Sequence, residues 1–405
     1  MKIFVLVHNM PNHGSWFRAL EIARRMAQRG HEVTMVGTSA EKYYRPRTRT
    51  TPDNVTIVEC GNFAFFNDKQ EGWGLFDIFT RLGLILKHRP DFVYAFSHKP
   101  CCVLPGLLAK LFGAKLAIDW SDWWGGHEGL FQSYVIPSFA FKSLPRIVRF
   151  LRRIVFAIDS YCEPRCLRFA NYVTLISQAY YEHPGSPKNL RDKSIVFYSG
   201  SDLVGITPME KSGARAQLRD VLSGIPQGAF ILGYIANFNP DEALMLNAFA
   251  KVCAQRNDVW LLAVGAGFEQ VTPTIHNAIN HRICHVGYRP FEELPQLLGA
   301  CDILLLPLDD RQLNRARYPH KMSDYVAAGR PIVTCDVGIA GTLMHQYDVK
   351  YVCEPNAKAF AETILRVLEH PAELEAVGAA NRKTAEAYWD WDRLCDRLFE
   401  FFEIR

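Results

Sequence analysis

The chain has 405 residues, of which 49% are apolar or aromatic and 22% are charged. At roughly 100–200 residues per domain this length predicts two or three domains, and the composition is that of a globular protein. The 46 basic and 42 acidic residues leave a net charge of +4. This balance argues against nucleic-acid binding by the protein as a whole.

Eleven cysteines are scattered along the chain without a CxxC pair, so we expect free thiols in a reducing compartment. The apolar run at residues 3–7 is too short for a signal peptide, and no run of about 18 apolar residues could span a membrane. We therefore expect a cytoplasmic protein, with the inner face of the membrane as a second expected location if the basic segment described below binds lipid.

The N-terminal half alternates apolar runs with helical patterns, which favours a doubly wound parallel sheet. In the expected strand 2–7, residues 3–7 are all apolar, as expected for a strand that is buried on both faces. Ser15 is a candidate N-cap for a helix that would end at Gly30. Strands are then expected at 32–37, 55–59, 92–96, 115–118, 171–176 and 194–198, with helices near 76–87 and 104–111.

The second half shows the same alternation of apolar runs and helical patterns after a turn-rich segment at 199–208. Strands are expected at 230–236, 260–265, 283–286, 303–308 and 331–336. We predict an α/β chain with two Rossmann-like domains, 1–202 and 203–385, and a C-terminal helix in 386–405 that packs back towards the first domain. The carboxyl ends of the strands would line a cleft between the domains and bind ligands there.

One segment, residues 139–168, differs from the rest of the chain because it holds seven basic residues and two acidic ones. Its four central arginines lie on one side of a helical wheel, and the opposite side carries Ile147, Leu151, Ile154 and Ile158. This pattern is typical of a basic amphipathic helix. Two interpretations stay open: a surface helix with a solvated basic face, which is the commoner case, and contact with an anionic membrane or a lipid-phosphate acceptor.

Two turns carry residues suited to binding a diphosphate. His13-Gly14 follows the first strand, where a glycine lets backbone N–H groups approach an anion at a helix N-terminus. Lys321 and Asp324 lie three residues apart on a predicted helix after the 303–308 strand. That helix could hold a diphosphate on its first amides and ribose hydroxyls on Asp324, or the two residues could form an exposed ion pair. No GxGxxG or P-loop motif is present, which disfavours a dehydrogenase.

The segment after the 115–118 strand combines carboxylates, a histidine and three tryptophans. Because indole rings stack on sugars, we predict an acceptor site with the rings Trp120, Trp123 and Trp124. Asp122 is the first candidate for the catalytic polar group and His127 the second. The alternative is a capping Asp and a packed Trp cluster, which we favour for Asp119. Asp390-Trp391-Asp392 spells a DxD but lies where a helix starts, so we interpret it as structural and predict no metal site.

The pattern Pro319-x-Lys321-x-x-Asp324-Tyr325-x-Ala327-Ala328-Gly329-x-Pro331 resembles the donor-site helix of retaining glycosyltransferases of family 4, which have the GT-B fold. Several other segments are similar to that family in the same order along the chain: Gly14 to Val36, Arg89-Pro90-Asp91, Pro105 to Ala109, Gly200-Ser201-Asp202, Gly265-Ala266-Gly267, Val286-Gly287-Tyr288 and Cys301-Asp302-Ile303. The resemblance therefore covers nearly the whole chain.

The resemblance implies a hexosyltransferase that moves a sugar from a UDP- or GDP-sugar to a glycan, lipid-linked or small-molecule acceptor, with retention and without a metal or other cofactor. The N-terminal domain would bind the acceptor and the C-terminal domain the donor. Asp324 would hold the ribose and Lys321 the phosphates. The implied donor contacts also include His13, Gly14, Asn237, Gly265, Val286, Gly287 and Tyr288.

The chain departs from the family pattern at two places near the donor. The first Glu of the usual E-x7-E is Ala316, so Asn314 and Arg315 are candidates for its polar role. The loop 237–242 lacks the usual Arg and Lys, and we hypothesise that Arg315, Arg317 or Lys321 replaces them. Because of these departures a second hypothesis stays open, in which the protein binds a nucleotide sugar or a partner without turnover.

Overall fold

The computed structural model describes residues 1–39, 41, 45–61, 72–126, 128–236, 241–265 and 277–404. The chain divides into unit 1, Met1–Tyr198 with Trp391–Arg405, and unit 2, Ser199–Asp390. The predicted boundaries at 202 and 386 both fall inside unit 2. There the Ser201 N–H donates to the Trp389 carbonyl at 2.7 Å, beside a bridge between Ser201 and Asp390, so the two ends of this unit are bound to each other.

Unit 1 is built on an eight-stranded sheet in the order β3-β4-β2-β1-β5-β6-β7-β8. All neighbours pair in parallel except β3 and β4. The strands are β1 Lys2–Val7, β2 Glu32–Thr38, β3 Arg47–Thr50, β4 Val55–Cys60, β5 Phe92–Phe96, β6 Lys115–Trp120, β7 Tyr172–Leu175 and β8 Ser194–Val196. Strand β1, which is apolar from Ile3 onwards, and the apolar strand β5 lie at the centre, as their composition predicts.

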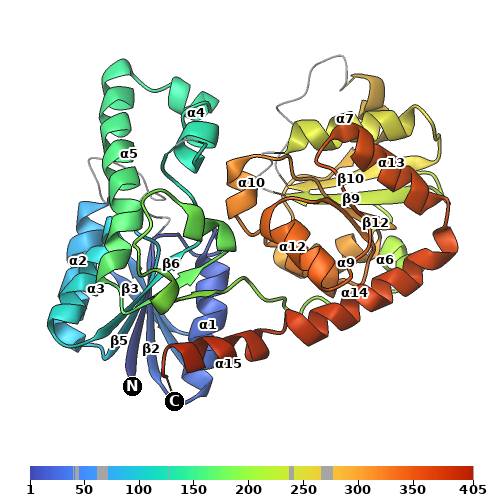
Figure 1. The fold of residues 1–405 in the computed structure, drawn as a ribbon. Coiled ribbons are helices and arrows are strands. Elements are labelled where there is room, and N and C mark those ends of the chain that lie inside the picture. The colour runs from blue at the N-terminus through green and yellow to red at the C-terminus, as the bar shows by residue number, and fades with distance from the viewer. Residues whose placement is uncertain are drawn as a thin grey trace. The chain divides into compact units, whose positions relative to one another are not determined.

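Helices cover both faces of this sheet, with α2 and α3 on one side and α1 and α15 on the other (Figure 1). They are α1 Trp16–Gln28, α2 Leu75–His88, α3 Pro100–Leu111, α4 Phe139–Lys142, α5 Arg146–Cys166 and α15 Trp391–Phe401. Short helical turns complete the unit: η1 Phe131–Val135, η2 Leu167–Phe169, η3 Gln178–Glu182 and η4 Arg191–Lys193.

Unit 2 has a six-stranded sheet in the order β11-β10-β9-β12-β13-β14, and every neighbouring pair is parallel. The strands are β9 Phe230–Ala236, β10 Val259–Gly265, β11 Ile283–His285, β12 Ile303–Leu306, β13 Ile332–Cys335 and β14 Val352–Cys353. The helices are α6 Lys211–Gln217, α7 Glu242–Cys253, α9 Leu294–Gly299, α10 Gln312–Ala316, α11 Lys321–Ala327, α12 Gly338–Gln346, α13 Ala357–Leu368 and α14 Leu374–Tyr388, with turns η5 Asn280–Arg282, η6 Phe291–Glu293 and η7 Pro371–Glu373.

Local details differ from the sequence expectations in four places. Ser15 makes no side-chain cap, and the Asn9 side chain instead accepts from the Ser15 N–H at 3.2 Å. The basic segment 139–168 is broken at 143–145, where Pro145 precedes α5. Strands β3 and β14, at the sheet edges, have no counterpart in the predicted set.

Over the part of the chain that the structure describes, no helix has the length and apolarity needed to cross a membrane.

A buried ion pair ties α1 to β6 in unit 1. The Arg18 guanidinium donates to Asp119 at 2.6 Å and to the Phe197 carbonyl at 2.6 Å, and Thr174 also donates to Asp119 at 2.5 Å. Arg18 and Asp119 are buried almost completely. The carboxylate of Asp119 is therefore a structural group of the core, which is the interpretation favoured from the sequence.

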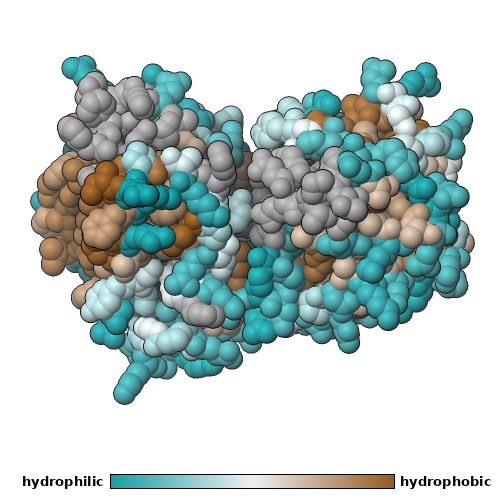
Figure 2. All heavy atoms as spheres, turned by 90° about the horizontal axis from the view of Figure 1, so that it is seen from above, coloured by the Kyte–Doolittle hydropathy of each residue, from teal (hydrophilic) through white to brown (hydrophobic). Residues whose placement is uncertain are grey.

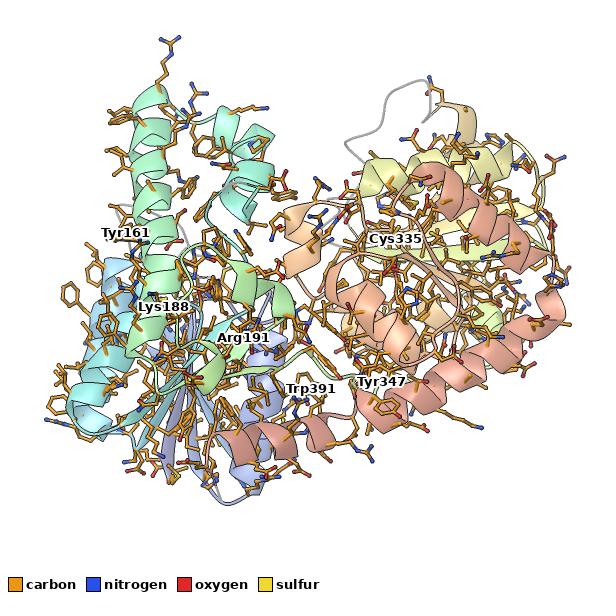
Figure 3. The ribbon with its side chains drawn as sticks, in the orientation of Figure 1. Tyr161, Lys188, Arg191, Cys335, Tyr347 and Trp391 are labelled. Atoms are coloured by element: carbon orange, nitrogen blue, oxygen red, sulfur yellow. The ribbon has the colours of Figure 1, made fainter. Side chains whose placement is uncertain are left out.

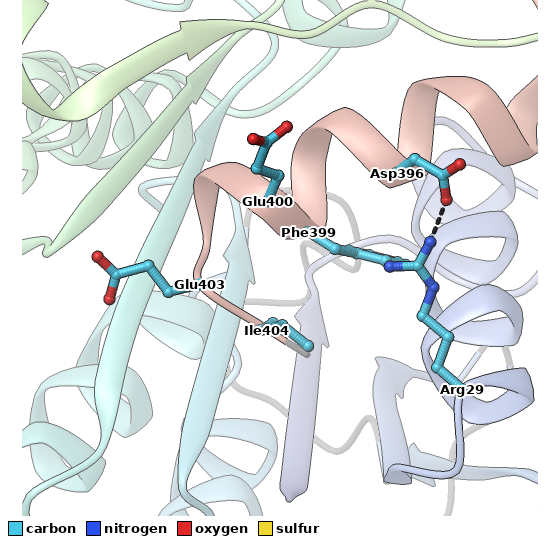
Figure 4. A pocket seen from close by; sticks show the side chains of 6 residues that line it. All are labelled: Arg29, Asp396, Phe399, Glu400, Glu403 and Ile404. Atoms are coloured by element: carbon cyan, nitrogen blue, oxygen red, sulfur yellow. Dashed lines mark hydrogen bonds and ion pairs between the residues drawn. The ribbon is translucent and has the colours of Figure 1, made fainter.

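The C-terminal helix α15 packs on α1 within unit 1. Arg25 pairs with Asp392 at 2.6 Å, and Arg29 pairs with Asp396 while its guanidinium lies 4.5 Å from the centre of the Phe399 ring. Trp391, labelled in Figure 3, begins this helix. A pocket lies beside Arg29, where α15 packs on the C-terminal end of α1 (Figure 4). This end of α1 is opposite the carboxyl edge of the sheet.

Replacement of Asp119 by Ala is expected to lower the free energy of unfolding by about 3–5 kcal/mol, because it leaves the Arg18 charge buried without a partner. Urea denaturation followed by tryptophan fluorescence measures the change. Glu41→Ala is the control, since Glu41 pairs with Arg47 in the same unit with both side chains more than 60% exposed. That control should change stability by less than about 1 kcal/mol. Equal effects of the two substitutions would contradict this account.

Candidate functional site

The carboxyl ends of β10 and β11 bring together three of the predicted donor residues. The Gly265 N–H donates to the Gly287 carbonyl at 2.8 Å, and the Val286 N–H donates to Ala263 at 3.0 Å. Both glycines have positive φ, +115° at Gly265 and +66° at Gly287. Tyr288, which follows, is 72% exposed. Both glycine turns therefore lie at the sheet edge where ligands of parallel α/β sheets bind.

Helix α11 is held firmly beside the strand β9 and the loop at the start of unit 2. The Tyr325 hydroxyl accepts from the Ile235 N–H at 2.9 Å, and Ser201 donates to the Ser323 carbonyl at 2.7 Å. Gly329 ends the helix with φ +64°, before Pro331, as the sequence predicts. The side chains that α11 presents to ligands thus stand on a rigid support.

Lys321 and Asp324 are partly buried on α11, and their pKa values are shifted towards neutrality. Burial, reinforced by the nearby Arg317, lowers the pKa of Lys321 to about 7. Burial, with the Asp202 carboxylate nearby, raises the pKa of Asp324 to about 7. Among the described residues neither group has an ion-pair partner, and the Lys321 ammonium lies 4.5 Å from the centre of the Tyr234 ring. Both groups would gain from a ligand that supplies the missing partners.

The arginines proposed to replace the family's basic pair already contact carboxylates. Arg317 donates to Asp241 at 2.7 Å, and Arg315 makes two bonds of 2.6 and 2.8 Å to Asp310. Asn314 is buried and donates to Asp241 at 2.6 Å. The charges of both arginines are therefore locally balanced, so neither is a ready substitute, and Asn314 acts first as a support for Asp241.

Asp241 is the residue of this edge that the sequence interpretation missed. It is buried, and Arg317 together with Asn314 and the Asp309 N–H keeps its pKa below the ordinary value. The neighbouring Asp309 has its pKa raised to about 6 by burial and by Asp241. The available signal was an aspartate directly before α7, four residues beyond the predicted donor residue Asn237. Asn237 itself lies outside the described residues.

In unit 1 the turn after β1 has the geometry that requires glycine. Gly14 has φ +52°, and a Cβ there would lie 2.7 Å from the Asn9 amide nitrogen. His13 is exposed, with its Nδ1 2.8 Å from the Pro11 carbonyl. The predicted pair thus sits at the start of α1 with an accessible backbone.

The three tryptophans of the predicted acceptor site have different environments. Trp120 is 2% exposed and Trp123 is 7% exposed, with the Trp123 ring centre 4.3 Å from that of His183. Protein atoms surround both rings. The prediction that these two rings stack on a sugar is therefore wrong, and the alternative of a packed tryptophan cluster is correct for them. Trp124 and Asp122 are partly buried and remain candidates, whereas His127 lies outside the described residues.

A buried charged cluster at the carboxyl ends of β1 and β5 was not predicted. Asp159 of α5 accepts from Lys99 at 2.5 Å and lies 3.0 Å from His98 Nε2, and both contacts hold its pKa below the ordinary value. The Lys99 ammonium is 3.9 Å from the centre of the Trp124 ring. Burial and Lys99 lower the pKa of His8, at the end of β1, to about 3. The sequence signal was the polar run His98-Lys99 directly after a buried strand.

Glu163, the second acidic residue of α5, holds the predicted acceptor loop. It is fully buried and accepts from the Trp120 indole at 2.8 Å, the Trp124 N–H at 2.9 Å and the Gly125 N–H at 2.7 Å. A carboxylate that accepts three bonds fixes the loop on both sides of Asp122. Glu163 is therefore a positioning residue for this loop.

Glu163→Ala should lower the free energy of unfolding by about 2–5 kcal/mol, because each buried donor left without an acceptor costs about 1–3 kcal/mol. Thermal and urea denaturation measure the loss. Glu182→Ala, an exposed glutamate of the same unit, is the matched control and should be near neutral. If Glu163→Ala behaves like that control, the loop does not depend on Glu163.

Comparisons with known proteins agree with this geometry. The family described as "Glycosyl transferase 4-like domain" matches residues 13–185, and the family "Glycosyl transferases group 1" matches residues 229–370. A GDP-mannose-dependent monoacylated alpha-(1-6)-phosphatidylinositol monomannoside mannosyltransferase of Corynebacterium glutamicum is 24% identical over 197 residues, which are 47% of this chain and 50% of that protein. The matched segment makes up 59% and 42% of the length of two other curated relatives. The chain therefore spans about half the length of the curated relatives it matches.

Solved structures show the same fold over the whole chain. Sucrose-phosphate synthase from Thermosynechococcus elongatus has a TM-score of 0.76 at 16% identity, covering 100% of this chain and 98% of that one. HepE of Anabaena in complex with UDP-glucose has a TM-score of 0.69 at 15% identity, covering 100% and 99%. With two family matches that together span most of both units, this chain belongs to the family 4-type glycosyltransferases with the GT-B fold.

Proposed function

We propose that this chain transfers a hexosyl-type sugar from a UDP- or GDP-sugar to a glycan, lipid-linked or small-molecule acceptor, with retention and without a metal or other resident cofactor. The observation that carries the proposal is the pair Lys321 and Asp324 on α11, partly buried with both pKa values near 7. Two relatives support the donor class: one is named as GDP-mannose-dependent, and HepE was solved with UDP-glucose.

In this proposal α11 and the glycine turns of unit 2 bind the donor. The Lys321 ammonium offers a positive charge to the diphosphate, and Asp324 accepts hydrogen bonds from the ribose hydroxyls. Negative charge grows on the diphosphate as the glycosidic bond breaks, and a fixed cation in a partly buried site stabilises that charge. Arg315 and Arg317 would reach the diphosphate only by leaving Asp310 and Asp241, so Lys321 supplies the positive charge in this proposal.

Unit 1 would supply the acceptor side. Asp122 and Trp124 lie on the loop that Glu163 holds, and the turn at Gly14, with φ +52°, leaves an accessible backbone at the start of α1. A lipid-linked acceptor is favoured among the three classes by the basic segment 139–168, through which we propose peripheral contact with an anionic membrane.

A second candidate function is nucleotide-sugar binding without turnover. It is favoured by Ala316 at the position of the family's first Glu and by the carboxylate partners of Arg315 and Arg317. Both candidates predict donor binding, so transfer or slow donor hydrolysis separates them. Turnover that disappears in Asp324→Ala supports the enzyme. Tight nucleotide binding with no turnover on any nucleotide sugar supports the second candidate.

Asp324→Asn is expected to weaken binding of the matching nucleotide sugar about tenfold to a hundredfold, since hydrogen bonds to a charged group contribute about 1.5–3 kcal/mol. A thermal-shift screen of UDP, GDP and their sugars identifies the donor first, because only a ligand of the folded state raises the melting temperature. Asp220→Asn, an exposed carboxylate of the same unit, is the control and should leave the shift unchanged. Unaltered affinity in Asp324→Asn would remove Asp324 from the donor site.

Donor affinity should be greatest near neutral pH. A bound diphosphate favours protonated Lys321, so affinity falls as pH rises above about 7, the pKa of that group in the free protein. Ribose hydroxyls favour ionised Asp324, so affinity also falls as pH drops below about 7. Calorimetric titration of a nucleotide sugar on both sides of neutrality measures the profile.

Two variants separate the limbs of this profile. Lys321→Arg keeps its charge at all accessible pH values and should abolish the alkaline decline. Asp324→Asn should abolish the acid decline while weakening binding overall. A wild-type profile that is flat from pH 6 to 9, a range of about one to two units on either side of both pKa values, would refute both assignments.

A further inference from the structure

The long helix α5 exposes an apolar stripe that no described part of unit 1 covers. Ile147 is 64% exposed, Phe150 60% and Tyr161 61%, and Leu151, Ile154 and Ile158 are each about 40% exposed or more. These residues recur at helical spacing, so they lie on one side of α5. The opposite side is buried and carries Phe156, Asp159 and Glu163. The helix therefore has its acidic residues inside and its apolar stripe outside.

Helix α2 adds a second exposed apolar ridge in the same unit. Phe79 is 68% exposed, Leu75 58% and Phe76 45%, again at helical spacing. The segment before α2 meets α5, because the Trp73 indole donates to Asp159 at 3.3 Å. Figure 2 shows apolar side chains gathered over this part of unit 1, at the left edge of the view. Monomeric proteins seldom expose apolar side chains in such groups without a binding role.

Basic residues of α5 lie to one side of the apolar stripe. Arg146 and Arg153 are exposed and Arg149 is partly exposed, and no carboxylate of the described residues lies within ion-pair distance of these three. Lys142 and Arg168 add exposed positive charge at the two ends of the segment. The partner of this surface must therefore accept aromatic and aliphatic side chains and carry negative charge beside them.

We infer that the surface formed by α5 and α2 binds an anionic phospholipid bilayer from one side. Lipid headgroups supply phosphates to the arginines, and the acyl boundary accepts the phenylalanine, isoleucine and leucine side chains. The surface extends onto α2, well outside residues 139–168. The inference rests on the proposed function for its purpose, which is to bring a lipid-linked acceptor to the loop that Glu163 of the same helix holds.

The inference is tested by flotation of the full chain with vesicles of phosphatidylcholine alone and of phosphatidylcholine mixed with phosphatidylglycerol. Wild-type protein should bind the mixed vesicles at least tenfold more strongly than the neutral ones, and added salt should weaken that binding. Phe79→Ser with Phe150→Ser, and separately Arg146→Glu with Arg153→Glu, should each reduce it about tenfold or more.

Matched controls lie in unit 2. Val204→Ser removes an apolar side chain that is 91% exposed, and Lys350→Glu reverses an exposed charge. Both should bind vesicles like the wild type. All substituted side chains are exposed, and melting temperatures verify that the variants fold.

Three results would overturn the inference: no binding to anionic vesicles, equal binding to neutral ones, or binding that survives both double substitutions. A concentration-dependent dimer that the same substitutions disrupt, without vesicle binding, would assign the surface to a second copy of the chain instead. Nucleotide-sugar thermal shifts on the same variants keep the two proposals apart. A retained shift with no vesicle binding rejects the surface alone, whereas vesicle binding without any shift rejects the donor site alone.

Discussion

Parallel pairing places the carboxyl ends of all strands at one edge of a sheet, and the candidate functional residues of both units depend on that constraint. Gly14 and His98 follow β1 and β5 in unit 1, and Gly265 ends β10 in unit 2. The loops that leave this edge are free to vary, while the strands behind them are buried and fixed. Each site is therefore assembled from segments far apart in the sequence. Backbone groups and a few polar side chains meet there because the sheet brings them together.

Buried charge separates the supports of the sites from the groups that would bind ligands. In unit 1, Asp119 has Arg18 and Asp159 has Lys99, so each of these two buried carboxylates lies within ion-pair distance of a cation. On α11, by contrast, Lys321 and Asp324 are partly buried without such partners among the described residues, and burial shifts both pKa values to about 7. An unpartnered group of this kind weakens the folded state and gains on binding. This difference supports the proposal that α11 binds the donor, whereas the other pairs are structural.

Local pattern was enough to predict most strands, since apolar runs such as those in β1 and β9 are typical of buried strands in an α/β fold. The donor helix was identified through a resemblance carried by Lys321, Asp324 and Gly329. Contacts between distant residues were beyond such patterns. Nothing local in Glu163 shows that it accepts from Trp120, and nothing in Asp241 shows that it would pair with Arg317. Likewise, an indole beside an aspartate has the same sequence whether it lies in a sugar site or, like Trp123, in the core.

Helix α5 shows why an amphipathic pattern does not determine which side of a helix faces the core. A wheel that separates arginines from isoleucines suggests that the isoleucines face the core. In unit 1 the inward side of α5 is instead set by Asp159 and Glu163. Their six polar contacts require an inward orientation and are made with His98, Lys99, Trp73, Trp120, Trp124 and Gly125. With the acids held inside, α5 forgoes burial of the isoleucine stripe, which for apolar surface contributes about 25 cal/mol per Å². The stripe is then left on the outside, where burial against a bilayer would recover the same free energy.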